Sequence, residues 1–491
     1  MNLKHDSGWA REMRTRTGVL VVGFLASLYA ACFTVIAFNR HDSFHTWAFD
    51  MGNMDQAAWN TIHGRWLAFT NMEGVTTRLA IHFEPTFILI SPIYLLWSDP
   101  KALLLLQTVA LASGAFPVYW LARKELNSVV AAVLISASYL LLPSLEAVNF
   151  AEFHPVALAA PLLLWGFYFA NNGQWWGYLS TSLLAMGTKE EVGLVVAMMS
   201  LYLAFTTRSR WIPLLVAALG VISSVMAVMV VIPHFNPNHA SPYVGYYSYL
   251  GRNLPAIAVN LLLHPWIPVQ KSLDEPPYLA SFLQPFGYLD LLAPERLLMG
   301  IPSFLINILS SDGEMQRPNL YHYTAPMIPA LMIATIAGVR RASRLLTKVG
   351  LGHRSALALV MAFLLLNTAI YQRQEGLTPL AEGFSLFPIT PHDQLAYQVM
   401  KLVPPDASLS VHPDLDAHLS EREKIYVFPR VADAQYVLMD RLRDVSSRDV
   451  LTVPTAEHRL RLKVLDQLIQ SGQWETLLDH DGYVLLKRKS Q

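Results

Sequence analysis

TGVLVVGFLASLYAACFTVIAF, residues 17–38, is an uninterrupted apolar run that decides the fold class. About 20 such residues suffice for one helix across a bilayer. The run exceeds the roughly 7–15 apolar residues of a secretory signal peptide, and no small-residue cleavage site follows it. We therefore interpret it as a retained first transmembrane helix with cations ahead of it: Lys4, Arg11, Arg14 and Arg16.

The composition of the whole chain agrees with this interpretation. Hydrophobic residues make up 53% of its 491 residues and charged residues 15%, whereas soluble domains carry roughly 25% charged residues. A formal net charge of zero gives no electrostatic support for a nucleic-acid partner. The lone cysteine, Cys32, lies within the first apolar run, so no intrachain disulfide can form. The chain is expected to be an integral membrane protein.

Positive charges beside transmembrane helices mark the cytoplasmic side. This rule places the N-terminus in the cytoplasm and the loop Asn39–Glu84 outside. The next apolar segment, Pro85–Trp97, is short and carries two prolines, so we expect a re-entrant or interfacial helix at the outer side. The later cationic clusters fall inside if the chain crosses about eleven times, at 17–38, 102–122, 129–143, 156–170, 175–187, 192–205, 211–232, 278–292, 297–309, 324–338 and 356–371.

The composition changes after Tyr371, where the chain becomes charged and lacks any apolar run of span length. Alternating patterns predict strands and one helical pattern predicts a helix, at 408–411, 434–439, 482–486 and 456–471. No nucleotide-binding glycine signature and no metal-ligand spacing occurs in this tail, which favours a structural or acceptor-contacting role.

The predicted fold class is an α-helical polytopic membrane protein with a small C-terminal exported α/β domain. Residues 1–371 form the membrane domain, within which residues 39–100 are an outer loop with juxtamembrane helices. Residues 372–491 form the soluble domain on the exoplasmic or periplasmic side.

Ionisable residues gather on one predicted face. None lies near the middle of a predicted crossing, which counts against proton-coupled transport and ion conduction. At or above the predicted outer surface lie Asp50, Asp55, His82, Glu84, Glu152, His154, Lys189, Glu190, Glu191, Asp312 and His322. Such a layout is expected of an enzyme that works where a lipid headgroup meets the outer solvent.

Two aspartates of the first outer loop are candidates for acid–base chemistry. Asp50 has apolar neighbours in FDMG, which suits a general base. The alternative is a helix N-cap at Asp50 or Asn53. Asp55 precedes Trp59 by four residues and shares its predicted helix face, so an ordinary solvated helical carboxylate is the alternative to a second catalytic acid.

Two short motifs bring histidine and glutamate together. His82 and Glu84 flank Phe83 in an extended stretch, so both side chains can point one way and bind a divalent cation or a phosphate-bearing ligand. Because a divalent cation is only one of these two possibilities, the sequence does not identify a cofactor. In the second motif, Glu152 and His154 either point into one site or simply precede the helix that a following proline starts.

The motif KEE combines Lys189, Glu190 and Glu191 at a predicted helix start. It offers a cation for a phosphate group and a carboxylate for a hydroxyl group. The helix dipole favours carboxylates in a first turn, which explains the glutamates but not the lysine.

Several motifs together resemble a known family. They are FD-x-G-x-x-x-Q (Phe49–Gln56), H-x-x-P (His82–Pro85), FHP (Phe153–Pro155), KEE (Lys189–Glu191), PFGYLDLLAPERLLMGIPSFLINILS (Pro285–Ser310), HYTAPMIPAL (His322–Leu331) and ADAQYVLMD in the tail. This set resembles the DUF2079 family of bacterial and archaeal membrane proteins. The layout is also similar to the GT-C superfamily of membrane glycosyltransferases, which use polyprenyl-phosphate sugars and place a catalytic acidic residue in the first outer loop.

The resemblance implies an inverting glycosyltransferase that moves a sugar from a polyprenyl-phosphate lipid donor to an exported glycan, lipid or protein acceptor. It implies catalytic roles for Asp50 and, second, Asp55. The residues expected to bind substrate are His82, Glu84, Glu152, His154, Lys189, Glu190, Glu191 and His322. Two alternatives stay open: a transporter or flippase-like protein for a lipid-linked substrate, and a non-catalytic assembly subunit whose tail recruits an exported partner.

Overall fold

The computed structural model describes residues 8–443 and 455–489, with side chains from residue 16 onward. Lys4 lies outside the described residues, as do the side chains of Arg11 and Arg14. By its internal contacts the chain divides into two compact units. Unit 1 holds residues 1–34, 105–230 and 241–385, and unit 2 holds residues 35–104, 231–240 and 386–491. The domain boundary expected at residue 372 stays a prediction.

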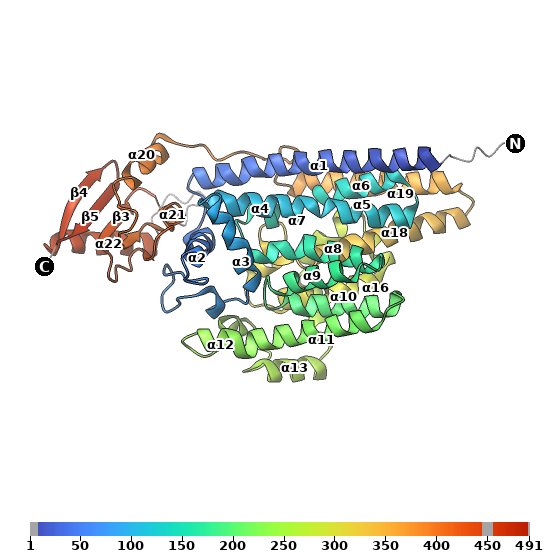
Figure 1. Ribbon diagram of the computed structural model, residues 1–491, viewed down its shortest axis with the longest axis horizontal. Helices are drawn as coiled ribbons and strands as arrows, with labels where there is room; N and C mark the ends of the chain where they lie inside the picture. Colours follow the sequence, from blue (N-terminus) through green and yellow to red (C-terminus); the bar gives the residue numbers. More distant parts are fainter. Residues whose placement is uncertain (1–7, 444–454, 490–491) are drawn as a thin grey trace. The chain divides into compact units, whose positions relative to one another are not determined.

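The described residues of unit 1 form helices and turns. Its helices are α1 (Gly8–Asp42) and α4 (Pro100–Ser113), both shared with unit 2, then α5 (Ala115–Leu126), α6 (Val129–Leu140), α7 (Pro143–Phe150), α8 (Ala159–Asn171), α9 (Trp175–Met186), α10 (Val192–Thr206), α11 (Trp211–Met226), α13 (Leu254–Leu263), α14 (Trp266–Asp274), α15 (Pro276–Leu283), α16 (Pro294–Leu297), α17 (Ile301–Leu309), α18 (Ile328–Lys348) and α19 (His353–Glu375). Helices consecutive in the chain pack against each other, as α10 does with α11 and α8 with α9 (Figure 1).

Helices α10 and α11 come especially close where two glycines face each other. A Cβ atom on Gly193 would lie 2.4 Å from the carbonyl oxygen of Gly220, and a Cβ atom on Gly220 would lie 2.4 Å from that of Gly193. Small residues allow this approach, which gains van der Waals contact where lipid supplies no hydrophobic drive.

Four stretches of the described helices are long and apolar enough to cross a membrane: Arg16–Asp42, Pro100–Leu126, Trp211–Phe235 and His353–Glu375. A fifth arises if α6 and α7, which bend by 44° at their junction, count as one broken span. These stretches coincide with predicted crossings. The other predicted crossings are shorter or more charged, so the total of about eleven and the orientation of the termini stay predictions.

The predicted crossing 278–292 is wrong as a continuous helix. Helix α15 ends at Leu283, and Gly287 and Tyr288 then take left-handed conformations with φ of 60° and 59°. A short 3-10 helix, Leu289–Leu292, follows. An apolar run alone did not reveal this turn, because hydropathy carries no information about backbone dihedrals.

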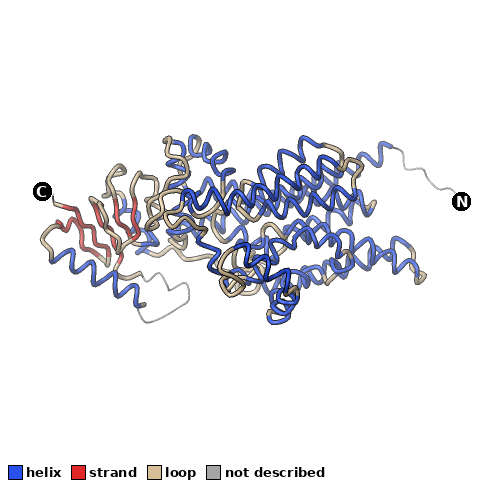
Figure 2. Tube along the Cα trace, turned by 90° about the horizontal axis from the view of Figure 1, so that it is seen from below, coloured by secondary structure: helices blue, strands red, loops and turns tan. Residues whose placement is uncertain are grey.

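The tail in unit 2 carries one five-stranded sheet, drawn in red in Figure 2, in the order β2-β1-β3-β5-β4. Strand β1 pairs in parallel with β2 and β3, whereas β5 pairs antiparallel with β3 and β4. The elements are α20 (Pro391–Met400), β1 (Leu409–Val411), α21 (Pro413–Asp416), β2 (Ile425–Val427), β3 (Tyr436–Asp440), α22 (Ala456–Gln470), β4 (Trp474–His480) and β5 (Tyr483–Arg488). The predicted fold class, helical and polytopic with a small α/β tail, is confirmed.

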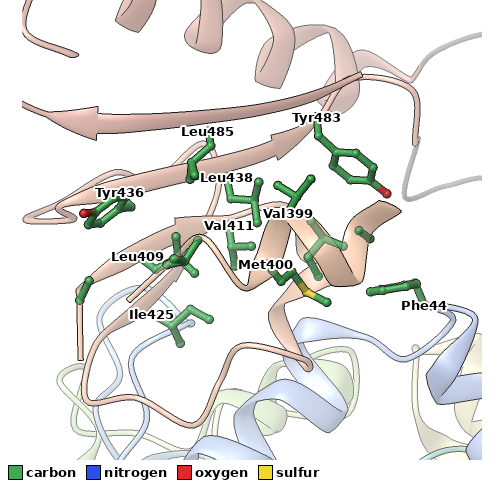
Figure 3. Packing of buried hydrophobic residues seen from close by; sticks show 14 residues of the cluster. Phe44, Val399, Met400, Leu409, Val411, Ile425, Tyr436, Leu438, Tyr483 and Leu485 are labelled. Carbon is green, nitrogen blue, oxygen red and sulfur yellow. The ribbon is translucent and has the colours of Figure 1, made fainter. Parts of the chain in front are cut away.

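The loop that follows α1 belongs to the same unit as the tail. Its elements are a π-helical turn η1 (Ala48–Gly52), α2 (Asn53–Ile62), η2 (Arg78–Ala80), α3 (Pro85–Ile90) and η3 (Ser91–Leu95), and α12 (Ile232–Phe235) joins them. Phe44 of this loop packs into the tail core with Val399, Met400, Leu409 and Tyr483 (Figure 3). The short helix expected at Pro85–Trp97 is present as α3 and η3.

A glycine of the FD-x-G motif allows a close approach between the loop and the tail. A Cβ atom on Gly52 would lie 1.9 Å from Oδ1 of Asp416, at the end of α21. Asp416 is fully buried, and its Oδ1 accepts a hydrogen bond from Nδ2 of Asn71 at 3.1 Å. Burial raises the pKa of Asp416 to about 7, against the opposing effects of Asn71 and the charge of Arg422.

Replacing Gly52 with alanine should destabilise unit 2, because the new methyl group and the Asp416 carboxylate cannot share that space. We expect a loss of roughly 1–3 kcal/mol, seen as a lower midpoint in thermal unfolding of the purified protein. Gly245→Ala is the control, since no atom lies within 4 Å of a Cβ placed there. Equal midpoints for Gly52→Ala and wild type would contradict the assigned packing.

The contribution of Asp416 to the stability of unit 2 should fall as pH rises. The pKa of Asp416 is higher in the folded chain, about 7, than the ordinary value of 3.8, so the folded state binds more protons between these values. This contribution is therefore greatest below pH 4 and declines up to pH 7, by at most about 4 kcal/mol. The difference in unfolding free energy between wild type and Asp416→Asn at pH 5 and at pH 8 measures the decline, because the buried histidines His412 and His418, whose pKa values burial lowers, titrate in both proteins.

Candidate functional site

Several predicted site residues come together in unit 1. His154 precedes the 3-10 helix η4 (Pro155–Leu158), Lys189 and Glu191 lie in the turn between α9 and α10, and His322 begins the 3-10 helix η11 (His322–Thr324). With Tyr323 they form what we call the lysine–histidine cluster. Its members come from three distant parts of the chain.

The contacts within the lysine–histidine cluster are continuous. Nζ of Lys189 lies 3.1 Å from Oε1 of Glu191 and 5.4 Å from the ring centroid of Tyr323. The ring of His322 lies 4.4 Å from that of Tyr323 and stacks on His154, with centroids 3.6 Å apart and planes 18° apart. The cluster therefore combines one ammonium group with two stacked imidazoles.

Lys189 stays charged although only 7% of its surface is exposed. Burial alone would lower the pKa of its ammonium group, but the negative charges of Glu191 and Glu190 outweigh burial, so the pKa lies above its ordinary value. Glu191 occupies the N-cap position of α10 without a side-chain capping bond. The ion pair with Glu191 therefore accounts for the lysine of the KEE motif, which the helix dipole does not explain.

A glutamine of α4 holds the chain just before His154. Nε2 of Gln107 donates to the carbonyl oxygen of Glu152 at 2.7 Å, and Oε1 of Gln107 accepts from the backbone N–H of His154 at 2.9 Å. Glu152 is buried and has a left-handed φ of 69°. Gln107 was missed as a site residue, although its polarity inside an apolar run was a usable signal.

In unit 2, Asp50 lies in the π-helical turn η1 and is partly exposed. The alternative of an N-cap is wrong for both Asp50 and Asn53. The N-cap of η1 is Trp47 and that of α2 is Gly52, and neither makes a side-chain capping bond. Asn53 instead begins α2, and its Nδ2 donates to the carbonyl oxygen of Phe49.

Glu84 is held by an arginine that sequence reasoning missed. Nε of Arg78 donates to one carboxylate oxygen of Glu84 at 2.9 Å and the Nη2 atom to the other at 3.0 Å, while Nη1 reaches Oδ1 of Asn53 at 3.0 Å. All three residues are buried. The partly exposed His82 is adjacent, and its backbone N–H donates to the carbonyl oxygen of Arg78 at 2.9 Å.

The contacts of Glu84 are relevant to the divalent cation that the sequence suggests at the His82–Glu84 motif. Both oxygens of Glu84 are engaged by Arg78. Among the residues that the structure describes, no three His, Cys, Asp or Glu side chains are grouped to hold a metal ion. A divalent cation stays an expectation of the sequence.

Asp55 is fully buried, so its interpretation as a solvated helical carboxylate is wrong. The hydroxyl groups of Tyr94 and Ser420 each lie 2.5 Å from one of its oxygens. Burial, followed by the negative charge of Glu421, raises the pKa of Asp55 well above its ordinary value. Because Ser420 belongs to the tail, Asp55 helps to join the loop after α1 to the tail, and Asp50 is the more accessible of the two aspartates.

Comparisons with known proteins place the chain in context. A family model described as "Predicted membrane protein (DUF2079)" matches residues 40–485. No curated protein matches the chain. Similar solved structures include ArnT from Cupriavidus metallidurans bound to undecaprenyl phosphate, with 13% identity and a TM-score of 0.48 over 95% of this chain and 98% of that one. The apo state of ArnT from Cupriavidus metallidurans has 14% identity and a TM-score of 0.46 over 95% and 99%.

Glu84→Gln should destabilise the protein by roughly 3–5 kcal/mol, because it leaves the Arg78 guanidinium buried without its counter-charge. Thermal or denaturant unfolding of the purified protein measures the loss. Glu382→Gln removes the same type of partner from the exposed Arg373 and should cost at most about 1 kcal/mol. Similar losses in both variants would show that burial is not the reason for the effect.

Proposed function

The chain belongs to the DUF2079 family of predicted membrane proteins, and we propose that it is a membrane glycosyltransferase. It transfers a sugar from a polyprenyl-phosphate donor to an acceptor at the outer face of the membrane. The observation that carries this proposal is the lysine–histidine cluster, a buried ammonium group that contacts two stacked imidazoles through the ring of Tyr323. Buried charge in a membrane protein is costly and is usually functional.

The cluster has the donors that a phosphate leaving group requires. The ammonium group of Lys189 has three N–H donors, and in the described part of the chain its ion-pair partner is Glu191. The remaining donors and an imidazole N–H of His154 or His322 bind phosphate oxygens. Because the surroundings are apolar, such charge stabilisation is stronger than in water.

Asp50 is the general base of the proposed reaction. The acceptor oxygen forms a bond to the anomeric carbon of the sugar, and its proton passes to the Asp50 carboxylate. The bond between the anomeric carbon and the phosphate oxygen breaks, and its electron pair stays on the phosphate. Attack from the side opposite to the leaving group inverts the anomeric configuration.

A transporter for a lipid-linked substrate is the main alternative. The broken helix pair α6 and α7 with the buried Glu146 would suit it, because transporters often bind substrate at discontinuous helices. However, Oε2 of Glu146 accepts hydrogen bonds from Nε2 of Gln372 at 3.1 Å and from the backbone N–H of Leu377 at 2.7 Å. Glu146 therefore stabilises the fold through these hydrogen bonds and is not needed to explain substrate binding. The enzyme is the better supported of the two functions.

The proposal predicts the behaviour of two variants. Asp50→Asn should slow transfer by roughly 10²–10⁴-fold, and Lys189→Gln should slow it by a similar factor through loss of charge stabilisation. Proteoliposomes are incubated with a panel of polyprenyl-phosphate sugars and a panel of hydroxyl-bearing acceptors. Release of free polyprenyl phosphate is measured, because that product is the same whichever sugar and acceptor react.

Two controls separate chemistry from folding. Glu73→Gln removes an exposed carboxylate from the same outer loop and should leave transfer unchanged, while Lys189→Arg keeps the cation and should retain partial activity. Thermal unfolding verifies that each variant is folded. Wild-type rates for a folded Asp50→Asn protein would reject Asp50 as the base, and no release by wild type with any pair of donor and acceptor would reject the enzyme.

A further inference from the structure

Unit 1 has a second polar feature, apart from the lysine–histidine cluster, at the C-terminal ends of α5 and α8. An open cavity of about 380 Å³ lies there. Its lining includes two cations, two amides and two aromatic rings: Arg123, Lys124, Asn127, Asn172, Trp120 and Tyr168. A cavity of this size is within the usual range for small-molecule sites.

The positive charge of this cavity is not neutralised by the protein. In the part of the chain that the structure describes, neither Arg123 nor Lys124 forms an ion pair with a carboxylate. The adjacent acid, Glu125, is engaged elsewhere, because Nη1 of Arg296 lies 2.5 Å from one of its oxygens and Nε of Arg340 lies 3.5 Å from the other. The cavity therefore attracts anions.

Helix capping accounts for one of the two cations. Cations near a helix C-terminus interact favourably with its carbonyl groups and dipole. Nζ of Lys124 does so, donating to the carbonyl oxygen of Asn171 at 2.9 Å, near the end of α8, and to Oδ1 of Asn172 at 3.3 Å. Arg123 donates from Nη1 to Oδ1 of Asn127 at 3.1 Å, but its buried Nε makes no hydrogen bond within the described residues. Helix capping therefore does not account for the Nε donor of Arg123.

The aromatic residues place the cavity at the level of lipid headgroups. The ring of Trp120 lies 5.1 Å from that of Tyr168 and 5.5 Å from that of Trp165. Trp120 lies near the end of the apolar stretch Pro100–Leu126. Tryptophan and tyrosine concentrate where a membrane meets water, so the cavity opens where phosphate headgroups are present at high local concentration.

We propose that this cavity binds the phosphate of an anionic phospholipid headgroup, with Arg123 and Lys124 as its donors. Basic pockets between transmembrane helices are suited to such headgroups. The forked guanidinium of Arg123 can donate from Nε and Nη2 to two phosphate oxygens. The flanking aromatic rings hold the glycerol and upper acyl region.

Binding is measured by native mass spectrometry of the full-length protein with phosphatidylglycerol and, separately, with zwitterionic phosphatidylcholine. We expect wild type to prefer phosphatidylglycerol. The double variant Arg123→Gln, Lys124→Gln should weaken phosphatidylglycerol binding by about tenfold, and Lys124→Arg should keep it. Inorganic phosphate is added as a competitor: displacement identifies a site for the phosphate group itself, and no displacement identifies one that needs the lipid chains.

The matched control removes two cations from another helix end. Arg208→Gln, Arg210→Gln lies in the turn between α10 and α11 and should change binding less than twofold, because neither arginine lines the cavity that Arg123 and Lys124 line. Thermal midpoints of the lipid-free proteins check that the variants are folded. Equal binding of both lipids by wild type, or equal losses in the cavity variant and the control, would overturn the proposal.

Discussion

The lysine–histidine cluster of unit 1 depends on the hydrogen bonds of Gln107. Inside a membrane protein, a backbone N–H or C=O group without a partner is costly. The amide of Gln107 donates to the carbonyl oxygens of Val148 and Glu152 at 3.2 and 2.7 Å and accepts from the N–H of His154. Gln107 therefore satisfies the carbonyl group of Glu152 and the N–H group of His154 where the chain leaves α7 and turns at Glu152 toward His322.

The buried charged side chains are likewise paired with hydrogen-bonding partners. Arg78 and Glu84 in unit 2 satisfy each other through two hydrogen bonds, and Lys189 and Glu191 pair in unit 1. The two pairs differ in their surroundings. Arg78 also bonds Asn53, which makes a closed structural network, whereas Lys189 lies near the ring of Tyr323, which in turn contacts the histidine stack. The second arrangement keeps donors available, which is why we place the ligand there.

Unit 2 shows that the polar loop after α1 is an integral part of a folded domain. The hydroxyl group of Thr70 donates to the carbonyl oxygen of Ile425 at 2.7 Å and accepts from its N–H at 2.8 Å. Ile425 lies on β2, an edge strand, whose exposed groups would otherwise be open to pairing. With Phe44 in the core and Gly52 against Asp416, the loop covers the tail and holds Asp50 in a defined turn.

The amino-acid sequence by itself determined the membrane class, the first apolar helix, the small α/β tail with β1, β3, β5 and α22, and the polar motifs. Hydropathy and periodicity are local properties, so a local pattern suffices for them. The three-residue strand β2 and the largely exposed β4 were missed, because neither has a pattern long enough to identify.

Only the tertiary structure decided which polar residues meet. It brought His154, Lys189 and His322 together, paired Glu84 with Arg78, buried Asp55 and excluded an N-cap at Asp50. It also grouped residues 35–104 with the tail, although some 280 residues separate them in the chain. Contacts across such distances depend on the packing of whole helices and sheets, and no short-range pattern in the sequence encodes that packing.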